Sequence, residues 1–196
     1  IIHSNQELSN NNIISLENII NNIKQNIPIQ YILGEAHFYN LKFKVNSSTL
    51  IPRGETEELV QYILLHDFIS VLEIGTGSGC IAVSIAKNSN AKITAIDNSI
   101  GALEIAKSNA VLNSVEINFE LRDVFSFSEI KKYDLIVSNP PYVLESEKKL
   151  MDKNVLDYEP HNALFVSDND PLIYYKEISK IATNNLNKNG LLFFEI

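Results

Sequence analysis

The sequence contains little cysteine and little arginine, and it has no long hydrophobic run. One cysteine, Cys80, among 196 residues excludes a disulfide framework and a cysteine-built zinc site, and it suits a reducing compartment. The 24 acidic residues outnumber the 16 Lys and Arg, and the only arginines are Arg53 and Arg122, which argues against a large phosphate-binding surface. No segment approaches the roughly 20 continuous apolar residues of a membrane span.

The four histidines show no spacing typical of metal ligands, so we expect no metal site. They are His3, His37, His66 and His161. What is present is an ordinary globular composition with 45% hydrophobic residues, at a length that fits one domain with a small appendage.

From residue 55 onward, short apolar runs alternate with helical patterns. Strands are expected at 71–74, 92–96, 117–121, 135–138 and 191–196, and helices at 55–66, 80–87, 99–112 and 171–186. Short strands separated by longer helices are typical of parallel strands joined by right-handed crossovers. The pattern therefore predicts an α/β fold with a doubly wound sheet.

The residues before this region predict a helix and a small antiparallel unit. Apolar residues recur at steps of three and four over 13–27, which places them on one helical face, and Pro28 ends the pattern. Leu41, Phe43 and Val45 alternate with lysines, as in a strand with one buried face. Residues 31–33 and 50–51 are the candidate partners of that strand.

A glycine-rich motif, Glu73-Ile74-Gly75-Thr76-Gly77-Ser78-Gly79, lies between the first strand of the sheet and the helix after it. Glycines allow the backbone to turn tightly and to approach a ligand at the carboxyl edge of a sheet. The spacing is G-x-G-x-G, and Cys80 stands where a dinucleotide-binding fold would have its third glycine. No Gly-Lys-Ser/Thr follows, which excludes a phosphate loop of the NTPase type. A plain glycine-rich connection is the alternative.

Two acidic residues follow the next strands. Asp97 ends the second strand about 20 residues after the glycines, where a carboxylate can hydrogen-bond both hydroxyls of a ribose. It can equally cap the helix that begins near Ser99. Asp123, after the third strand, can accept a hydrogen bond from an exocyclic amine, with Val124 or Phe125 packing on an aromatic base, or it can serve as a cap.

The segment Asn139-Pro140-Pro141-Tyr142 directly follows the fourth strand. Consecutive prolines keep the backbone extended and remove two N–H donors while leaving carbonyl acceptors. Asn139 adds an amide oxygen and Tyr142 a planar face, so the segment suits a planar –NH2 group; a proline-stiffened loop is the alternative. If Asn139 and the Pro140 carbonyl accept both hydrogens of such a nitrogen, its lone pair is turned toward an electrophilic methyl group.

The glycine loop, Asp97 and Asn-Pro-Pro-Tyr, in this order, resemble the class I S-adenosylmethionine-dependent methyltransferases. A second signature resembles the HemK/PrmC family within that class. Its segments are Gln-Tyr-Ile-Leu-Gly-Glu at 30–35, Phe-Tyr at 38–39, Leu-Ile-Pro-Arg-Gly-Glu-Thr-Glu-Glu-Leu-Val at 50–60 and Tyr-Glu-Pro-His-Asn-Ala-Leu-Phe at 158–165. The family usually has a second proline where this chain has Gly54, a change that loosens the turn.

The resemblance implies transfer of a methyl group from S-adenosylmethionine to the side-chain amide nitrogen of the glutamine in the Gly-Gly-Gln motif of peptide chain release factors. It implies that Asn139, Pro140, Pro141 and Tyr142 hold this glutamine, with Asn139, Pro140 and Tyr142 as catalytic residues. The cofactor contacts that it implies are Glu73, Gly75, Thr76, Gly77, Ser78, Gly79, Asp97, Asp123, Val124 and Asn139. It also implies a cytoplasmic monomer with no metal, no membrane and no direct nucleic-acid contact.

The resemblance further implies a domain organisation. Residues 1–28 would be the remnant of an N-terminal helical substrate-recognition domain, 29–53 a β-hairpin linker and 54–196 the S-adenosylmethionine-binding catalytic domain with a Rossmann-like sheet. Such enzymes add two strands after the fifth, whereas this sequence starts without Met and ends on the apolar run 191–196. We therefore expect a fragment without its C-terminal strands, whose unpaired edge strand is prone to aggregate.

Two alternatives to this function differ in class. The first is a methyltransferase acting on the exocyclic amine of adenine in RNA or DNA, because such enzymes share Asn-Pro-Pro-Tyr. The net charge of −8 counts against it. The second is a nucleotide-binding module without catalysis, which would leave Asn139-Pro140-Pro141-Tyr142 without a use.

Overall fold

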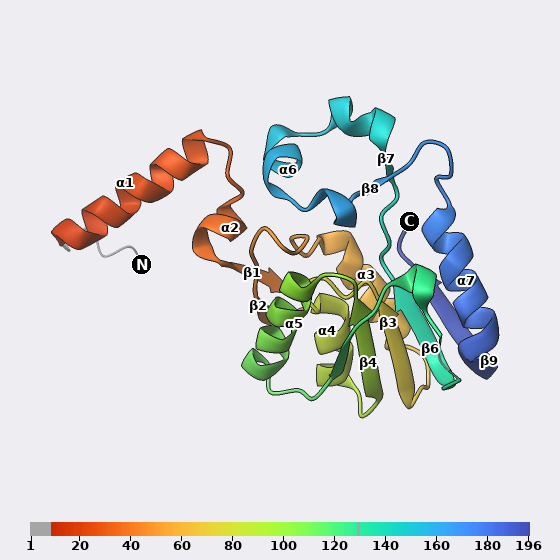
Figure 1. The fold of residues 1–196 in the computed structure, drawn as a ribbon. Helices are drawn as coiled ribbons and strands as arrows, with labels where there is room; N and C mark the ends of the chain where they lie inside the picture. The colour runs from red at the N-terminus through yellow and green to blue at the C-terminus, as the bar shows by residue number, and fades with distance from the viewer. Residues whose placement is uncertain (1–8, 129) are drawn as a thin grey trace.

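A computed structural model describes residues 9–128 and 130–196 (Figure 1). Five parallel strands form its main sheet, in the order β5-β4-β3-β6-β9. Their bounds are Asn118–Leu121 for β5, Lys92–Asp97 for β4, Ser70–Ile74 for β3, Tyr133–Ser138 for β6 and Leu186–Phe194 for β9. This arrangement confirms the predicted α/β fold with a doubly wound, Rossmann-like sheet.

Helices cover both faces of this sheet. Consecutive residues of β3 point in opposite directions, so that Val71 packs in one apolar cluster and Leu72 in another. The first cluster includes residues of α3 (Gly54–Ile63), α4 (Cys80–Asn88) and α5 (Ile100–Leu112), and the second includes residues of α7 (Ile173–Asn185). The strands carry near-continuous apolar runs because both of their faces are buried.

A long excursion follows β6, in a region where the sequence pattern predicts no helix or strand. It contains, in order, β7 (Val143–Leu144), η2 (Glu145–Leu150), α6 (Lys153–Tyr158), η3 (His161–Ala163) and β8 (Phe165–Val166). The strands β7 and β8 pair in parallel as a separate small sheet. Figure 1 shows the excursion above the main sheet, between α2 and α7.

The antiparallel unit before the main sheet has a different partner from the predicted one. The strand β2 (Leu41–Lys44) pairs with β1 (Glu35–Phe38). Residues 31–33 belong to the short helix α2 (Ile29–Leu33) and residues 50–51 to no strand, so their predicted pairing is wrong. The pairing differs because Gly34 ends α2: its φ of 70° is in the left-handed region, and β1 begins at the next residue.

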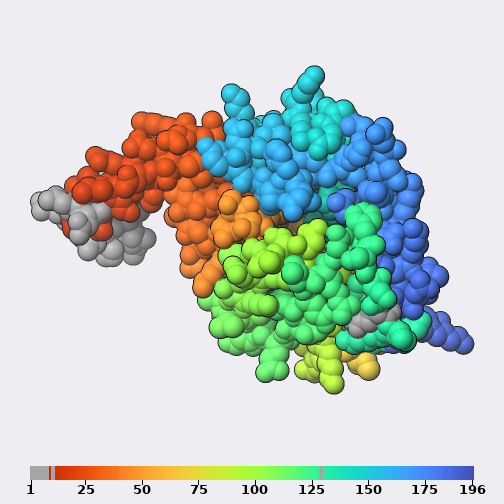
Figure 2. All heavy atoms as spheres, viewed as in Figure 1, coloured from red at the N-terminus to blue at the C-terminus, as the bar shows by residue number. Residues whose placement is uncertain are grey.

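The first helix, α1 (Asn10–Lys24), forms where helical periodicity predicts it, but it projects away from the rest of the molecule (Figures 1 and 2). The apolar stripe along this helix consists of Ile13, Leu16, Ile20 and Ile23, which are 42–49% exposed. The stripe lies on one helical face as predicted, and in the described part of the chain this face is open to solvent.

The strand β9 begins earlier than the predicted strand at 191–196. Helix α7 runs directly into it, and Leu186 already pairs with Tyr133 of β6. A register shift between Tyr133 and Leu135 interrupts the ladder before Leu191 pairs with Leu135. The polar residues 187–190 carry no strand periodicity, and for this reason the sequence does not reveal the first half of β9.

Candidate active site

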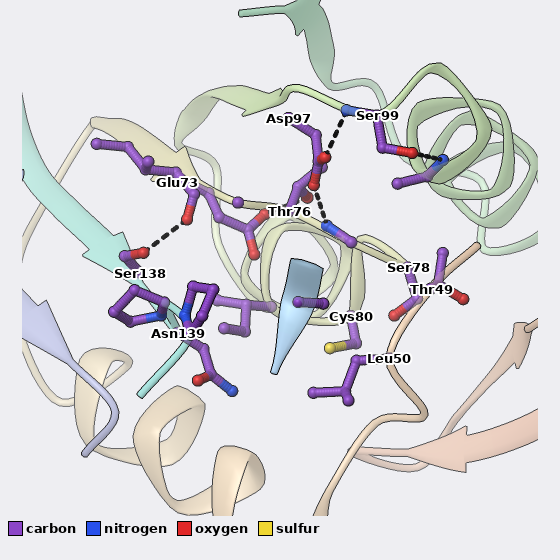
Figure 3. A pocket seen from close by; sticks show the side chains of 18 of the residues that line it. Thr49, Leu50, Glu73, Thr76, Ser78, Cys80, Asp97, Ser99, Ser138 and Asn139 are labelled. Atoms are coloured by element: carbon purple, nitrogen blue, oxygen red, sulfur yellow. Dashed lines mark hydrogen bonds between the residues drawn. The ribbon is translucent and has the colours of Figure 1, made fainter. Parts of the chain in front are cut away.

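The three chemistry-bearing motifs follow three neighbouring strands of the main sheet. Ile74, the last residue of β3, pairs with Ile96 of β4 on one side and with Ser138 of β6 on the other. The glycine loop, Asp97 and Asn139 come immediately after these residues. Because the carboxyl ends of parallel strands meet at one edge, the motifs line a single cavity there (Figure 3).

The glycine loop adopts a backbone conformation that explains its composition. Gly75, Gly77 and Gly79 have φ values of 76°, 54° and 80°, in the left-handed region that residues with a side chain rarely adopt. The backbone N–H groups of Gly75 and Thr76 both donate to the Ile96 carbonyl, at 2.9 and 3.0 Å. These bonds hold the loop against the end of β4, and Gly79 leads into α4 as its N-cap.

Asp97 accepts hydrogen bonds from two backbone N–H groups and also lines the cavity. One carboxylate oxygen accepts from the Gly77 N–H at 2.8 Å and the other from the Ser99 N–H at 2.9 Å (Figure 3). Burial raises the pKa of Asp97, and these backbone donors oppose that rise. The cap of α5 itself is Ser99, whose hydroxyl accepts from the Ala102 N–H. Each Asp97 oxygen keeps capacity for a further donor.

Glu73 begins the glycine motif as a buried acid, with 1% of its surface exposed. Its Oε2 accepts from the Thr76 hydroxyl at 2.6 Å, and burial raises its pKa to about 8. The neighbouring Cys80 starts α4, where a helix N-terminus alone would lower the pKa of a thiol. Burial instead raises the pKa of Cys80 to about 12, which favours the neutral thiol.

The Asn-Pro-Pro-Tyr segment borders the cavity opposite Asp97. The Ser138 hydroxyl donates to the Ile74 carbonyl at 2.7 Å, which fixes the end of β6 against the glycine loop (Figure 3). Asn139, Pro140 and Pro141 line the cavity, and Figure 3 shows the Asn139 amide at its edge. Tyr142 does not line it: the side chain is 44% exposed and lies near Glu195 and Arg53.

Two further predicted contacts lie outside the cavity lining. Gly79 is turned toward Ala106 of α5, which lies 3.1 Å from the position of a Cβ added to the glycine. Asp123 is exposed, and its carboxylate accepts from the Phe125 N–H at 2.9 Å as the cap of η1 (Val124–Ser126). The capping alternative for Asp123 is thus the one observed, whereas Val124 does line the cavity.

An ion pair that no sequence motif had assigned includes Arg53, which lines the cavity. Arg53 pairs with the buried carboxylate of Glu159 at 2.5 Å, and the other oxygen of Glu159 accepts from the Ile51 N–H at 3.2 Å. These bonds tie the segment before α3 to the excursion after β6. Both partners lie in segments that resemble the HemK/PrmC family, which is the one signal that could have paired them. Further lining residues that the analysis did not assign include Leu50, Pro52, Asn162, Ala163, Tyr174 and Ile178.

Comparison with known proteins identifies the family. Residues 47–159 match the family model described as "Methyltransferase small domain". A release factor glutamine methyltransferase from Flavobacterium psychrophilum is 49% identical over an alignment that covers 100% of this chain and 72% of that protein. The chain belongs to the release factor glutamine methyltransferase family. A family member from Bacteroides thetaiotaomicron is 50% identical, with 92% of this chain and 67% of that protein covered.

Solved structures show that this family member shares its fold with other methyltransferases. A Thermus thermophilus 16S rRNA N2 G1207 methyltransferase, solved with AdoMet and guanosine, matches with a TM-score of 0.57. It is 14% identical, and the match covers 82% of this chain and 40% of that one. Coclaurine N-methyltransferase matches with a TM-score of 0.51, 20% identity and coverage of 95% and 52%. These likenesses concern the class I methyltransferase fold.

Two features are absent from the part of the chain that the structure describes, a membrane-spanning helix and a metal-binding cluster. Within residues 9–128 and 130–196, no helix combines the length and the apolar character needed to cross a membrane. In the same described residues, no group of three or more His, Cys, Asp and Glu side chains is arranged to hold a metal ion.

Proposed function

We propose that this chain methylates the side-chain amide nitrogen of the glutamine in the Gly-Gly-Gln motif of a peptide chain release factor, with S-adenosylmethionine as the methyl donor. The observation that carries the proposal is the position of Asn139, Pro140 and Pro141 on the same cavity as Asp97 and the glycine loop. A methyl donor held by the loop and an amide held by Asn139 would then meet inside one cavity. The names of the curated relatives support this substrate.

The residues of the cavity fit S-adenosylmethionine. Asp97 retains acceptor capacity for ribose hydroxyls after its two backbone hydrogen bonds. Val124 offers an apolar surface to the adenine ring, and the left-handed glycine loop lets the backbone approach the ligand without side chains in between. Gly79 and Asp123 then act by supporting the loop and the position of Val124. When bound, S-adenosylmethionine supplies a methyl group on a positively charged sulfur.

The chain's own residues would orient the glutamine. Its amide nitrogen is a weak nucleophile because the lone pair is delocalised. Asn139 Oδ1 and the Pro140 carbonyl would accept its two hydrogens and so fix the direction of the nitrogen. Tyr142, which follows Pro141, is exposed and lies outside the cavity lining. In the product, one methyl replaces one hydrogen, which leaves as a proton. Positioning of this kind supplies several kcal/mol, up to roughly 7–11 in ideal cases.

The domain assignment is part of the proposal. Residues 54–196 would form the catalytic domain, 29–53 the hairpin linker and 1–28 part of the recognition domain for the release factor. The exposed stripe of α1 supports the last assignment, because a solvent-facing apolar stripe fits a partner surface. A cytoplasmic location would follow from a substrate that works in translation, and we expect the enzyme to act as a monomer without a metal.

Methyl transfer to defined substrates tests the proposal. Purified protein is incubated with radiolabelled S-adenosylmethionine and a release factor, with the same release factor carrying Gln→Ala in its Gly-Gly-Gln motif, and with RNA. We expect label on the first substrate alone. Label that survives the Gln→Ala change would overturn the proposal. Label that appears only on RNA would overturn it too and would favour the adenine-methylating alternative.

A further inference from the structure

A partly buried carboxylate, Glu195, follows the strand next to the one that ends at the proposed amide acceptor. Phe194, the last residue of β9, pairs with Ser138 of β6, so Glu195 and Asn139 each follow one member of this pair. The Glu195 N–H donates to the Ser138 carbonyl at 3.1 Å, and the Tyr175 hydroxyl donates to the Glu195 carbonyl at 3.0 Å. These two bonds hold the backbone of Glu195, and Figure 1 shows the end of the chain beside the segment that leaves β6.

The Glu195 side chain turns toward Asn139 and Thr56. Both neighbours make hydrogen-bonding contacts that lower the pKa of Glu195, against a larger rise caused by burial. A contact that lowers the pKa of an acid stabilises its anion, so both neighbours act as donors. The donor of an asparagine side chain is its Nδ2 group, and Nδ2 directed to Glu195 leaves Oδ1 free to face the cavity.

The second oxygen of the Glu195 carboxylate lowers the stability of the folded protein, a penalty that a residue with only a structural role would avoid. Glu195 Oε2 is buried and has no hydrogen-bond partner. Leaving a buried acceptor unsatisfied typically destabilises a protein by about 1–3 kcal/mol. An apolar residue of similar size would fill this space without that penalty, so stability does not account for a carboxylate here.

We infer that Glu195 is a positioning residue, which holds the Asn139 amide with Nδ2 toward its own carboxylate and Oδ1 toward the nitrogen to be methylated. Without that contact, the Asn139 amide can rotate by half a turn and present donors to the substrate amide, which itself offers donors. Glu195 thus acts through Asn139 rather than on the substrate. This inference rests on the proposed function, because it assigns the orientation of the acceptor in the same site.

A double-mutant cycle between Glu195 and Asn139 tests the inference. We expect Glu195→Leu to lower kcat about 10- to 100-fold, with the Kd for S-adenosylmethionine changed by less than about threefold. In an Asn139→Ala background, Glu195→Leu should cause no further loss, because the residue through which it acts is gone. Glu195→Gln keeps an acceptor oxygen and should restore most of the activity. Where Glu195→Leu does not fold, Glu195→Ala takes its place in the cycle.

Glu55 provides a matched control. It is an exposed carboxylate close enough to raise the pKa of Glu195, so Glu55→Gln removes one negative charge from the same neighbourhood without touching Asn139. We expect its kcat to match that of the unmodified enzyme. Wild-type kcat for Glu195→Leu, or a loss that persists undiminished in the Asn139→Ala background, would overturn the inference. Absence of glutamine methylation by the unmodified enzyme would instead overturn the proposed function, so the two failures are distinguishable.

Discussion

At the scale of the residue, the site separates groups that face the cavity from groups that shape it. Asp97 does both, because its carboxylate caps backbone N–H groups and still has capacity for a ligand. Asp123 only shapes the site through its bond to Phe125, and Val124 beside it faces the cavity. The sequence placed these residues correctly at strand ends, but it left open which of two hydrogen-bonding roles each acid has. That choice depends on backbone geometry that no sequence pattern specifies.

Replacement of Asn139 is the most direct test at this scale. Asn139→Ala removes the side-chain acceptor while the Pro140 carbonyl remains. We expect kcat for release factor methylation to fall about 100-fold or more, because the glutamine nitrogen is no longer aligned. The Kd for S-adenosylmethionine, measured by calorimetry, should change by a smaller factor. Unchanged turnover would contradict the assignment of Asn139 as the amide acceptor.

Glu73 gives a prediction about pH. Its pKa rises to about 8 in the folded protein from an ordinary value of 4.5, so between these pH values the folded state holds a proton that the unfolded chain has released. The contribution of Glu73 to the free energy of unfolding therefore falls as the pH rises through this window. Glu73→Gln should remove this part of the decline.

Urea unfolding of both proteins at several pH values from about 5 to about 8.5 measures the effect, because this range covers most of the window between 4.5 and about 8. Asp97 and Glu195 also have raised pKa values, so some decline should remain in the variant. The stability difference between Glu73→Gln and the unmodified protein should therefore grow with pH. A difference that is constant across the range would contradict the role of Glu73 burial.

At the scale of the element, hydrophobic periodicity predicted most of the structure. The strands β3, β4, β5 and β6 and the helices between them lie where short apolar runs and helical patterns place them, because their apolar residues pack into the clusters on the two faces of the sheet. The errors concern elements whose position depends on distant partners. Residues 31–33 look like a strand in isolation but form α2, and the first half of β9 is recognisable only through its pairing with β6.

The start of α3 offers a stabilising substitution. Gly54 is the first residue of this helix, a Cβ at this position would meet no atom within 4 Å, and Arg53 before it has the extended ψ of 152° that a following proline requires. We expect Gly54→Pro to raise the free energy of unfolding by about 0.4–1 kcal/mol, because proline restricts the unfolded chain and suits the first helical turn.

Equilibrium unfolding in urea checks this prediction, with Gly75→Ala as the contrasting variant. Gly75 has a φ of 76°, so alanine there is strained even though a Cβ would meet open space. The two substitutions should change stability in opposite directions. A lower stability for Gly54→Pro would show that the N-terminus of α3 is held differently from the structure described.

The exposed stripe of α1 gives a second prediction for an element. Ile20→Glu places a charge in the stripe, which is solvent-facing, so stability should not change. If this stripe contacts the release factor, KM for that substrate should rise about fivefold or more, with kcat retained. Asn18→Glu is the control, because Asn18 is also exposed and lies on the opposite side of the same helix. Equal KM values for the two variants would contradict a docking role for the stripe.

At the scale of the whole molecule, the site exists because four strand ends meet. The order β4-β3-β6-β9 brings Asp97, the glycine loop, Asn139 and Glu195 to one edge of the sheet, although they are spread over more than half of the chain. The first three could be found from the sequence, because each lies in a recognisable motif after a strand. Glu195 could not, since nothing in the sequence indicates that β9 pairs with β6 in the register that puts it beside Asn139.

The central claim is that the cavity methylates a glutamine side chain on its amide nitrogen. Tandem mass spectrometry of a release factor after incubation with this protein and S-adenosylmethionine tests it most directly, because fragment masses locate the added methyl group. We predict one methyl group, on the glutamine of the Gly-Gly-Gln motif, absent when Asn139→Ala replaces the unmodified protein. A methyl group on any other residue, or none on this glutamine, would contradict the account.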